Sequence, residues 1–156
     1  MKIFTHKSYA VLTSITALIV LSACSGAPEE KYQTVTLNGN VELQAGPVPA
    51  GTIHFRLYTL WFLEGDLRHP LEEIEDFQSD SANFTHTFEY PLHKGTGFAI
   101  HAWIDTDDDG VFCTPSVRTD PGGLAWTEET PSSEIDMTIT LTDNCRNASW
   151  FYPPAP

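Results

Sequence analysis

Two segments establish the fold class of this chain: Phe84-Thr-His-Thr-Phe-Glu-Tyr90 and Gly97-Phe-Ala-Ile-His-Ala-Trp-Ile104. Apolar side chains recur at every second residue of both segments, which is the period of a β-strand with one buried face. The same alternation recurs in residues 35–43, 53–57 and 135–141, whereas the 3.6-residue period of an amphipathic helix is almost absent. The chain is therefore predicted to fold from β-strands.

Glycine, proline, asparagine and aspartate separate these segments and predict turns between them. About six to eight short strands predict an all-β domain, a two-sheet immunoglobulin-like or prealbumin-like β-sandwich over residues 34–146. Asn38-Gly39-Asn40 fits either a continuous strand or the turn of a hairpin. Residues 71–77 fit either one helical turn or a short edge segment, and Pro121-Gly122-Gly123 is predicted to be a turn.

Residues 1–23 have the pattern of a secretory signal peptide. Lys2 and Lys7 precede an apolar run of about 12 residues, whereas a membrane-spanning helix needs about 20. The run ends in Leu21-Ser22-Ala23-Cys24, which resembles the lipobox of bacterial lipoproteins. That resemblance implies cleavage before Cys24 and attachment of diacylglycerol to its thiol. The alternative is ordinary cleavage nearby, with Cys24 left as a spare thiol.

The lipobox resemblance also implies a location. Ser25, rather than aspartate, follows the cysteine, which in Gram-negative lipoproteins implies export to the outer membrane. Acyl chains would then anchor the protein without a spanning segment. Residues 24–33 are small, polar and charged, as expected for a lipidated tether, and residues 147–156 are predicted to form an extended proline-rich tail.

Acidic residues strongly outnumber basic ones, with 21 Asp and Glu against 8 Lys and Arg and a net charge of −13. Without Lys2 and Lys7, the mature chain keeps 6 basic residues and a net charge of −15. Nucleic acid is a disfavoured partner, because phosphate binding depends on Lys and Arg. The charge instead predicts a protein partner with a basic patch, and it requires that membrane attachment be hydrophobic.

Three segments, in order, resemble the small β-sandwich lipoproteins that include the pilot lipoproteins of type III secretion. They are Val48-Pro-Ala-Gly-Thr-Ile-His-Phe-Arg-Leu57 and the two segments quoted first. Where that family has a short glycine turn after the third segment, this chain has an acidic loop, which resembles prealbumin-like bacterial domains with Asp-rich loops. The resemblance implies a lipid-anchored sandwich that binds a protein partner in the envelope.

The acidic loop reads Asp105-Thr-Asp107-Asp-Asp109-Gly110-Val111. Carboxylates at positions 1, 3 and 5 with glycine at position 6 reproduce the first half of a calcium-binding loop, in which the next carbonyl is a further ligand. The predicted ligands of a structural calcium ion are therefore the side chains of Asp105, Asp107 and Asp109 and the carbonyl of Val111. The alternative is a solvated acidic turn, which Asp and Gly also favour.

Two features exclude an EF-hand. Position 12 of the loop is Ser116 rather than glutamate, and the preceding segment is a strand rather than a helix. A carboxylate from elsewhere, such as that of Asp120, is then needed to complete the coordination shell.

Two cysteines, Cys113 and Cys145, remain if Cys24 carries lipid. In an oxidising envelope they are expected to form a disulfide. Closing a loop of roughly 33 residues would stabilise the fold by about 3 to 4 kcal/mol on the chain-entropy model. A zinc site is the alternative, but neither cysteine has a closely spaced second ligand.

The sequence carries no constellation typical of an enzyme, because no serine or threonine lies in a nucleophile motif. By alternation, His54, His101 and Trp103 are expected on outward faces, and His86 is expected to be a hydrogen-bonded core residue. The chain is therefore predicted to be a non-catalytic binding or assembly domain. The alternative is a carbohydrate- or peptide-binding module that uses exposed aromatic residues among Trp61, Trp103, Trp126 and Trp150.

The lipobox yields a direct prediction. A Cys24→Ala variant should incorporate no labelled palmitate and should leave the outer-membrane fraction, because its thiol is the proposed attachment point. Metabolic labelling and membrane fractionation of the wild type and the variant check this. Continued incorporation by the variant would show that lipid is attached elsewhere or not through this motif.

Overall fold

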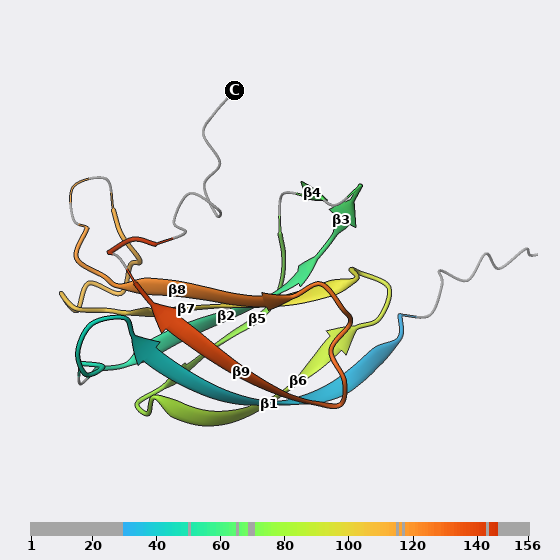
Figure 1. Cartoon of the computed structure of the whole chain (residues 1–156), viewed down its shortest axis with the longest axis horizontal. Coiled ribbons are helices and arrows are strands. Elements are labelled where there is room, and N and C mark those ends of the chain that lie inside the picture. The colour runs from blue at the N-terminus through green and yellow to red at the C-terminus, as the bar shows by residue number, and fades with distance from the viewer. Residues whose placement is uncertain are drawn as a thin grey trace, which may run out of the picture.

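The computed structural model describes residues 30–146 except residues 50, 65, 69, 70, 115, 117 and 143. The predicted signal peptide, Cys24 and the tail 147–156 lie outside the described residues. Within them, strands form two main sheets that face each other (Figure 1). The first sheet has the order β6-β1-β9, made of β6 (Asn83–Pro91), β1 (Tyr32–Leu43) and β9 (Glu134–Leu141).

The second sheet has the order β5-β2-β7-β8. It consists of β5 (Glu72–Ser79), β2 (Ile53–Leu60), β7 (Gly97–Ile104) and β8 (Gly122–Thr127). A small hairpin, β3 (Phe62–Leu63) with β4 (Asp66–Leu67), follows β2. The predicted all-β sandwich is therefore confirmed. No helix in the described part of the chain is long and apolar enough to cross a membrane.

Pairing within the sheets is antiparallel except between β1 and β9, which run parallel. β1 lies in the middle of its sheet, so both of its edges are hydrogen-bonded. In the second sheet, the register between β2 and β5 shifts at Leu57 and Tyr58, as at a β-bulge. The alternating segments of the sequence correspond to the inner strands β1, β2 and β7 and to the edge strands β6 and β9.

The core lies between the sheets and is built from the apolar positions of the alternating segments. Each strand sends every second side chain inward, which explains why the two-residue period was visible in the sequence. The Tyr90 hydroxyl, inside this core, donates a hydrogen bond to the Gly97 carbonyl at 2.9 Å, so its polar atom is satisfied. The buried residues of this core include Val35, Leu37, Val41, Ile53, Phe55, Leu57, Phe88, Tyr90, Phe98, Ile100, Ile104, Ile139 and Leu141.

β1 settles the first of the open alternatives. It is one continuous strand through Asn38-Gly39-Asn40, not a hairpin, and it begins at Tyr32, inside the tether predicted to extend to Gln33. Gly39 points inward opposite Phe84, and a Cβ on Gly39 would fall within the Phe84 ring. Glycine is needed here for packing rather than for a turn, because the ring fills the space that its side chain would occupy.

Two other segments differ in part from expectation. Residues 71–77, left open between a helical turn and an edge segment, belong mostly to the edge strand β5. Pro121-Gly122-Gly123 was predicted to be a turn, but Gly122 and Gly123 begin β8. A Cβ on Gly123 would collide with the backbone of Thr140 on β9, so the absence of a side chain permits a close approach between the two sheets.

The contact between Gly39 and Phe84 can be tested by adding a side chain. Gly39→Val should lower the free energy of unfolding by about 2 kcal/mol, because it overpacks the space held by Phe84. Denaturant unfolding measures this. In a Phe84→Ala background the same substitution should cost much less, and equal costs in both backgrounds would contradict the proposed contact.

Candidate metal site

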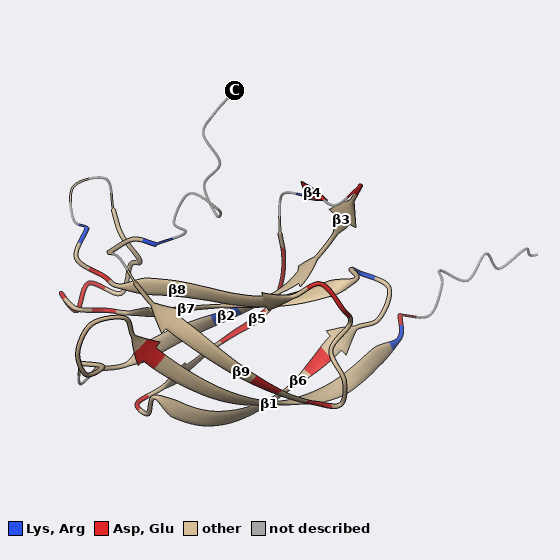
Figure 2. Cartoon of the chain, viewed as in Figure 1, with Lys and Arg blue, Asp and Glu red and all other residues tan. Residues whose placement is uncertain are grey.

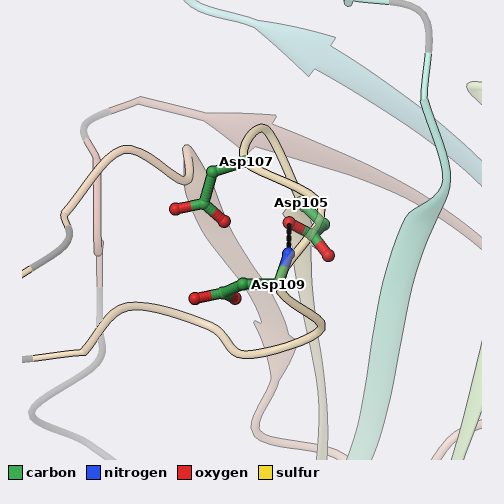
Figure 3. Close-up of side chains that lie close together, drawn as sticks. All are labelled: Asp105, Asp107 and Asp109. Atoms are coloured by element: carbon green, nitrogen blue, oxygen red, sulfur yellow. Dashed lines mark hydrogen bonds between the residues drawn. The ribbon is translucent and has the colours of Figure 1, made fainter.

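The three predicted aspartate ligands lie together on the loop that follows β7 (Figure 3). Asp105, Asp107 and Asp109 each offer a carboxylate oxygen, and these oxygens all lie within 4.8 Å of one another. Asp105 is half-buried, while Asp107 and Asp109 are exposed. The spacing in the sequence therefore predicted a real cluster of oxygen atoms, which is the donor type that calcium prefers.

Hydrogen bonds from the loop backbone hold this cluster. The amide of Gly110 donates to Asp105 Oδ2 at 2.8 Å, and the amide of Asp109 donates to Asp105 Oδ1 at 3.3 Å. The amide of Val111 donates to Asp109 Oδ1 at 2.8 Å. Gly110 has a φ of 72°, a conformation that glycine adopts at little cost, so the sharp turn expected at position 6 is present.

The electrostatics of Asp105 favour its ionised form. Desolvation raises its pKa, but hydrogen bonds from loop amides outweigh this effect and lower the pKa below its ordinary value. The donors are the amides of Gly110, Asp108, Asp109 and Asp107.

Asp107 shows the opposite shift. Desolvation, followed by the negative charges of Asp109 and Asp120, raises its pKa, and the hydrogen bond from the Thr119 hydroxyl at 3.3 Å only partly opposes this. The repulsion between Asp107 and Asp109 is the kind that a bound cation would relieve.

Asp120 differs from the position expected for it. Its side chain is 1% exposed, and it lies outside the three-aspartate cluster. Oδ1 accepts hydrogen bonds from the amide and the hydroxyl of Thr106, both at 2.9 Å, and Oδ2 accepts one from the amide of Cys113 at 3.5 Å. Its carbonyl accepts the amide of Cys145 at 2.7 Å. Asp120 thus fastens both ends of the loop instead of facing a cation.

The predicted disulfide between Cys113 and Cys145 is confirmed. Their Cα atoms are 5.6 Å apart, within the range of native disulfides. The bond joins the loop after β7 to the segment after β9, next to the Asp120 carbonyl. The acidic loop is consequently fixed at one end by Asp105 and Thr106 and at the other by Cys113.

The outer face of β7 is covered, which overturns one sequence expectation. His101 and Trp103 were expected to point to solvent, but they are 1% and 5% exposed. Phe112, from the loop, packs against both rings with centroid distances of 4.9 and 5.4 Å, and His54 stacks on Trp103 at 4.1 Å. The alternation correctly gave the face of the sheet, but it carried no information that a loop would fold back over that face.

Burial lowers the pKa of His101 to about 4, despite a hydrogen-bond contact between Nε2 and the Arg146 carbonyl at 3.4 Å. The imidazole is therefore neutral at physiological pH and belongs to the packed face rather than to a proton-transfer site. One feature of the sequence indicates this packing, because Phe112 is a large apolar residue inside an otherwise polar loop. No local pattern distinguished the buried Asp120 from the other aspartates.

The remaining candidates are dispersed. His86 on β6 stacks on Phe77 and pairs with Glu75, both of which are on β5 of the other sheet. Its side chain is half-buried. The hydrogen bond agrees with the expectation for His86, but the partial exposure does not agree with a position in the core. Trp61 and Trp126 are 44% and 52% exposed. His69 and Trp150 lie outside the described residues.

No family model matches the chain, and no curated protein matches it. One solved structure, described as an alternative pilotin from the type II secretion system of Vibrio cholerae, is similar with a TM-score of 0.41 and 13% sequence identity. The alignment covers 72% of this chain and 97% of that chain.

The buried His101 predicts a pH dependence of stability. Its pKa is about 4 when folded and 6.5 ordinarily, so the unfolded chain binds more protons between these values, and lowering the pH through this window destabilises the fold. The loss from this residue should be about 3 kcal/mol. Urea unfolding at pH 7 and pH 4.5 should show a smaller difference for His101→Gln than for the wild type.

His93→Gln is the matched control, because His93 is exposed. Its pH dependence should follow that of the wild type. An unchanged pH dependence in His101→Gln would contradict the assignment of the effect to the buried imidazole.

Proposed function

We propose that this chain is a lipid-anchored protein of the bacterial envelope whose sandwich acts by binding a protein partner in an assembly role, without catalysis. Its acidic loop binds one structural calcium ion. The observation that carries the calcium proposal is the convergence of the Asp105, Asp107 and Asp109 oxygens within 4.8 Å. The lipid anchor rests on the sequence at Leu21-Ser22-Ala23-Cys24.

Calcium is the cation whose chemistry suits this loop. It takes oxygen ligands in flexible geometry, and three carboxylates with the Val111 carbonyl would supply part of its shell. Because Asp120 is engaged by Thr106 and Cys113, water molecules or another oxygen donor would have to supply the remaining positions. The loop is anchored on both sides, so a cation would rigidify a segment whose ends are already held.

Binding rather than turnover is supported by the distribution of polar groups. In the described ranges, His93 pairs with Glu30 at 3.9 Å, whereas His86 stacks on Phe77 and pairs more closely with Glu75. The described contacts of this pair include no serine, threonine or cysteine that it would activate. The imidazole of His101 is buried and neutral. These surroundings suit structural roles better than general acid–base catalysis.

A carbohydrate- or peptide-binding module is the second candidate, and one observation favours it. Trp126 lies on β8 and is 52% exposed, and an exposed indole ring can stack on a sugar. Trp103 is unsuited to this role because it is packed between His54 and Phe112. Retention on a glycan array that is lost in Trp126→Ala and kept in Trp61→Ala would favour this candidate over the protein-binding proposal.

The assembly proposal is tested by capture from solubilised envelope. The immobilised mature domain should retain a specific protein with a basic patch, and retention should weaken as salt rises, because the mature chain carries a net charge of −15. Reciprocal capture with the purified candidate confirms a direct complex. Hydrolytic activity that persists through purification, without any salt-sensitive partner, would instead indicate an enzyme.

The calcium proposal predicts a gain in stability. At a free calcium concentration of 100 Kd, binding to the folded form alone stabilises by about 2.7 kcal/mol, so Tm should be higher with calcium than with EDTA. The double variant Asp107→Asn, Asp109→Asn should lose this response. Thermal melts and titration calorimetry with calcium measure both effects.

Asp108→Asn is the matched control, since Asp108 lies in the same loop but outside the cluster. Its φ of 58° is one that asparagine also tolerates. This variant should keep the calcium response. Coincident melting curves for wild type in EDTA and in calcium would refute the site.

A further inference from the structure

The sandwich has two ends, and acidic and basic residues occur at both of them (Figure 2). The loop with Asp105, Asp107 and Asp109 lies at the end where β7 finishes, next to the start of β2. The chain enters the fold at the opposite end, at Lys31 and the start of β1.

This second region, here called the tether end, consists of Lys31, Tyr32, Leu92, His93 and Lys94. The amide of Leu92 donates to the Lys31 carbonyl at 2.9 Å, so the residues at the start of β1 and those after β6 are neighbours. Tyr32 is 50% exposed and Leu92 is 42% exposed. The tether end thus presents an aromatic and an aliphatic side chain to solvent.

The tether end carries two lysines, which lie beside the carboxylates of Glu30 and Glu72. Lys31 and Lys94 are the only lysines of the sequence after residue 23, and both are here. Lys94 pairs with Glu72 at 2.7 Å and with Glu30 at 3.8 Å, which partly neutralises these two carboxylates. An anionic lipid surface would repel this end less than the acidic loop.

The length of the predicted tether limits how far this end can stand from the membrane. Residues 24–30 join the proposed lipidated cysteine to the first strand region, and seven residues span at most about 25 Å. β1 has 12 residues and extends for roughly 40 Å toward the other end. The tether therefore allows the tether end to touch the bilayer, whereas the acidic loop lies several Debye lengths of about 8 Å farther along the molecule.

We propose that the sandwich docks on the phospholipid bilayer through its tether end, with Tyr32 and Leu92 at the lipid interface and the acidic loop directed away from the membrane. This inference rests on the lipid anchor at Cys24 included in the proposed function. Tyrosine suits the interface because its ring is apolar and its hydroxyl is polar. Docking orients the calcium loop toward partners rather than toward lipid.

The test uses the lipidated protein reconstituted into vesicles of phosphatidylethanolamine and phosphatidylglycerol. Thr96→Cys and Gln44→Cys each place one thiol-reactive fluorophore at an exposed position, the first beside the tether end and the second just after β1 at the other end. Cys113 and Cys145 do not react because they are paired. Lipids with a quencher in the head-group region should quench the label at residue 96 several-fold more strongly than the label at residue 44.

A second substitution tests the contact itself. Leu92→Asp should reduce quenching at residue 96 to the level at residue 44, because a carboxylate disfavours the anionic interface. Thr140→Asp is the control: Thr140 is exposed and pairs with Glu42, near the other end of β1. It should leave the quenching difference intact.

Failure of the orientation and failure of the anchor give different results. Wild-type protein that does not float with the vesicles would overturn the lipid anchor, and the docking with it. Protein that floats but shows equal quenching at residues 96 and 44 would overturn the docking alone. Unchanged quenching in Leu92→Asp would likewise exclude the proposed interface contact.

Discussion

A buried carboxylate organises one end of this molecule. Removing the Asp120 side chain from water is costly unless its oxygens are hydrogen-bonded. The amides of Thr106 and Cys113 donate hydrogen bonds to these oxygens. The same residue accepts the Cys145 amide through its carbonyl, beside the disulfide. The position of the acidic loop, the link to the segment after β9 and the placement of Phe112 over β7 all depend on these contacts. A covalent and an electrostatic constraint thus act on the same loop.

The two outer faces of the sandwich have different characters. On the sheet β6-β1-β9, the outward positions are threonine, asparagine, aspartate and glutamate, and Thr36, Asn38 and Asn40 follow one another along β1. On the other sheet, β7 is buried at every position. Phe112 covers one part of that face, and Phe62 and Leu67 of the β3–β4 hairpin pack near Tyr58 and Ala99 on another part. The outer face of the first sheet is therefore polar and suited to contact with water. The outer face of the second sheet requires covering segments to complete its packing.

Local patterns in the sequence were sufficient to predict the strands and the aspartate cluster, since both depend on residues close together in the chain. Alternation located β1, β2, β6, β7 and β9, and the Asp105–Asp107–Asp109 spacing gave the convergent oxygens. Local patterns failed where packing between distant segments determines the structure. Gly123 suggested a turn but is required by the approach of β9, and His101 lay on an outward face that a distant loop covers. The role of Asp120 depends on partners 7 and 14 residues away, which no local pattern contains.

The central position of β1 has a mechanical consequence. A pulling force transmitted through an amino-terminal anchor would enter the domain at Tyr32 and run along the strand axis. β1 is hydrogen-bonded to β6 on one side and to β9 on the other, so this load would shear both rows of bonds at once instead of opening them one after another. Shearing requires many bonds to yield together, and the tethered strand is therefore the part of the sandwich most resistant to extraction by force.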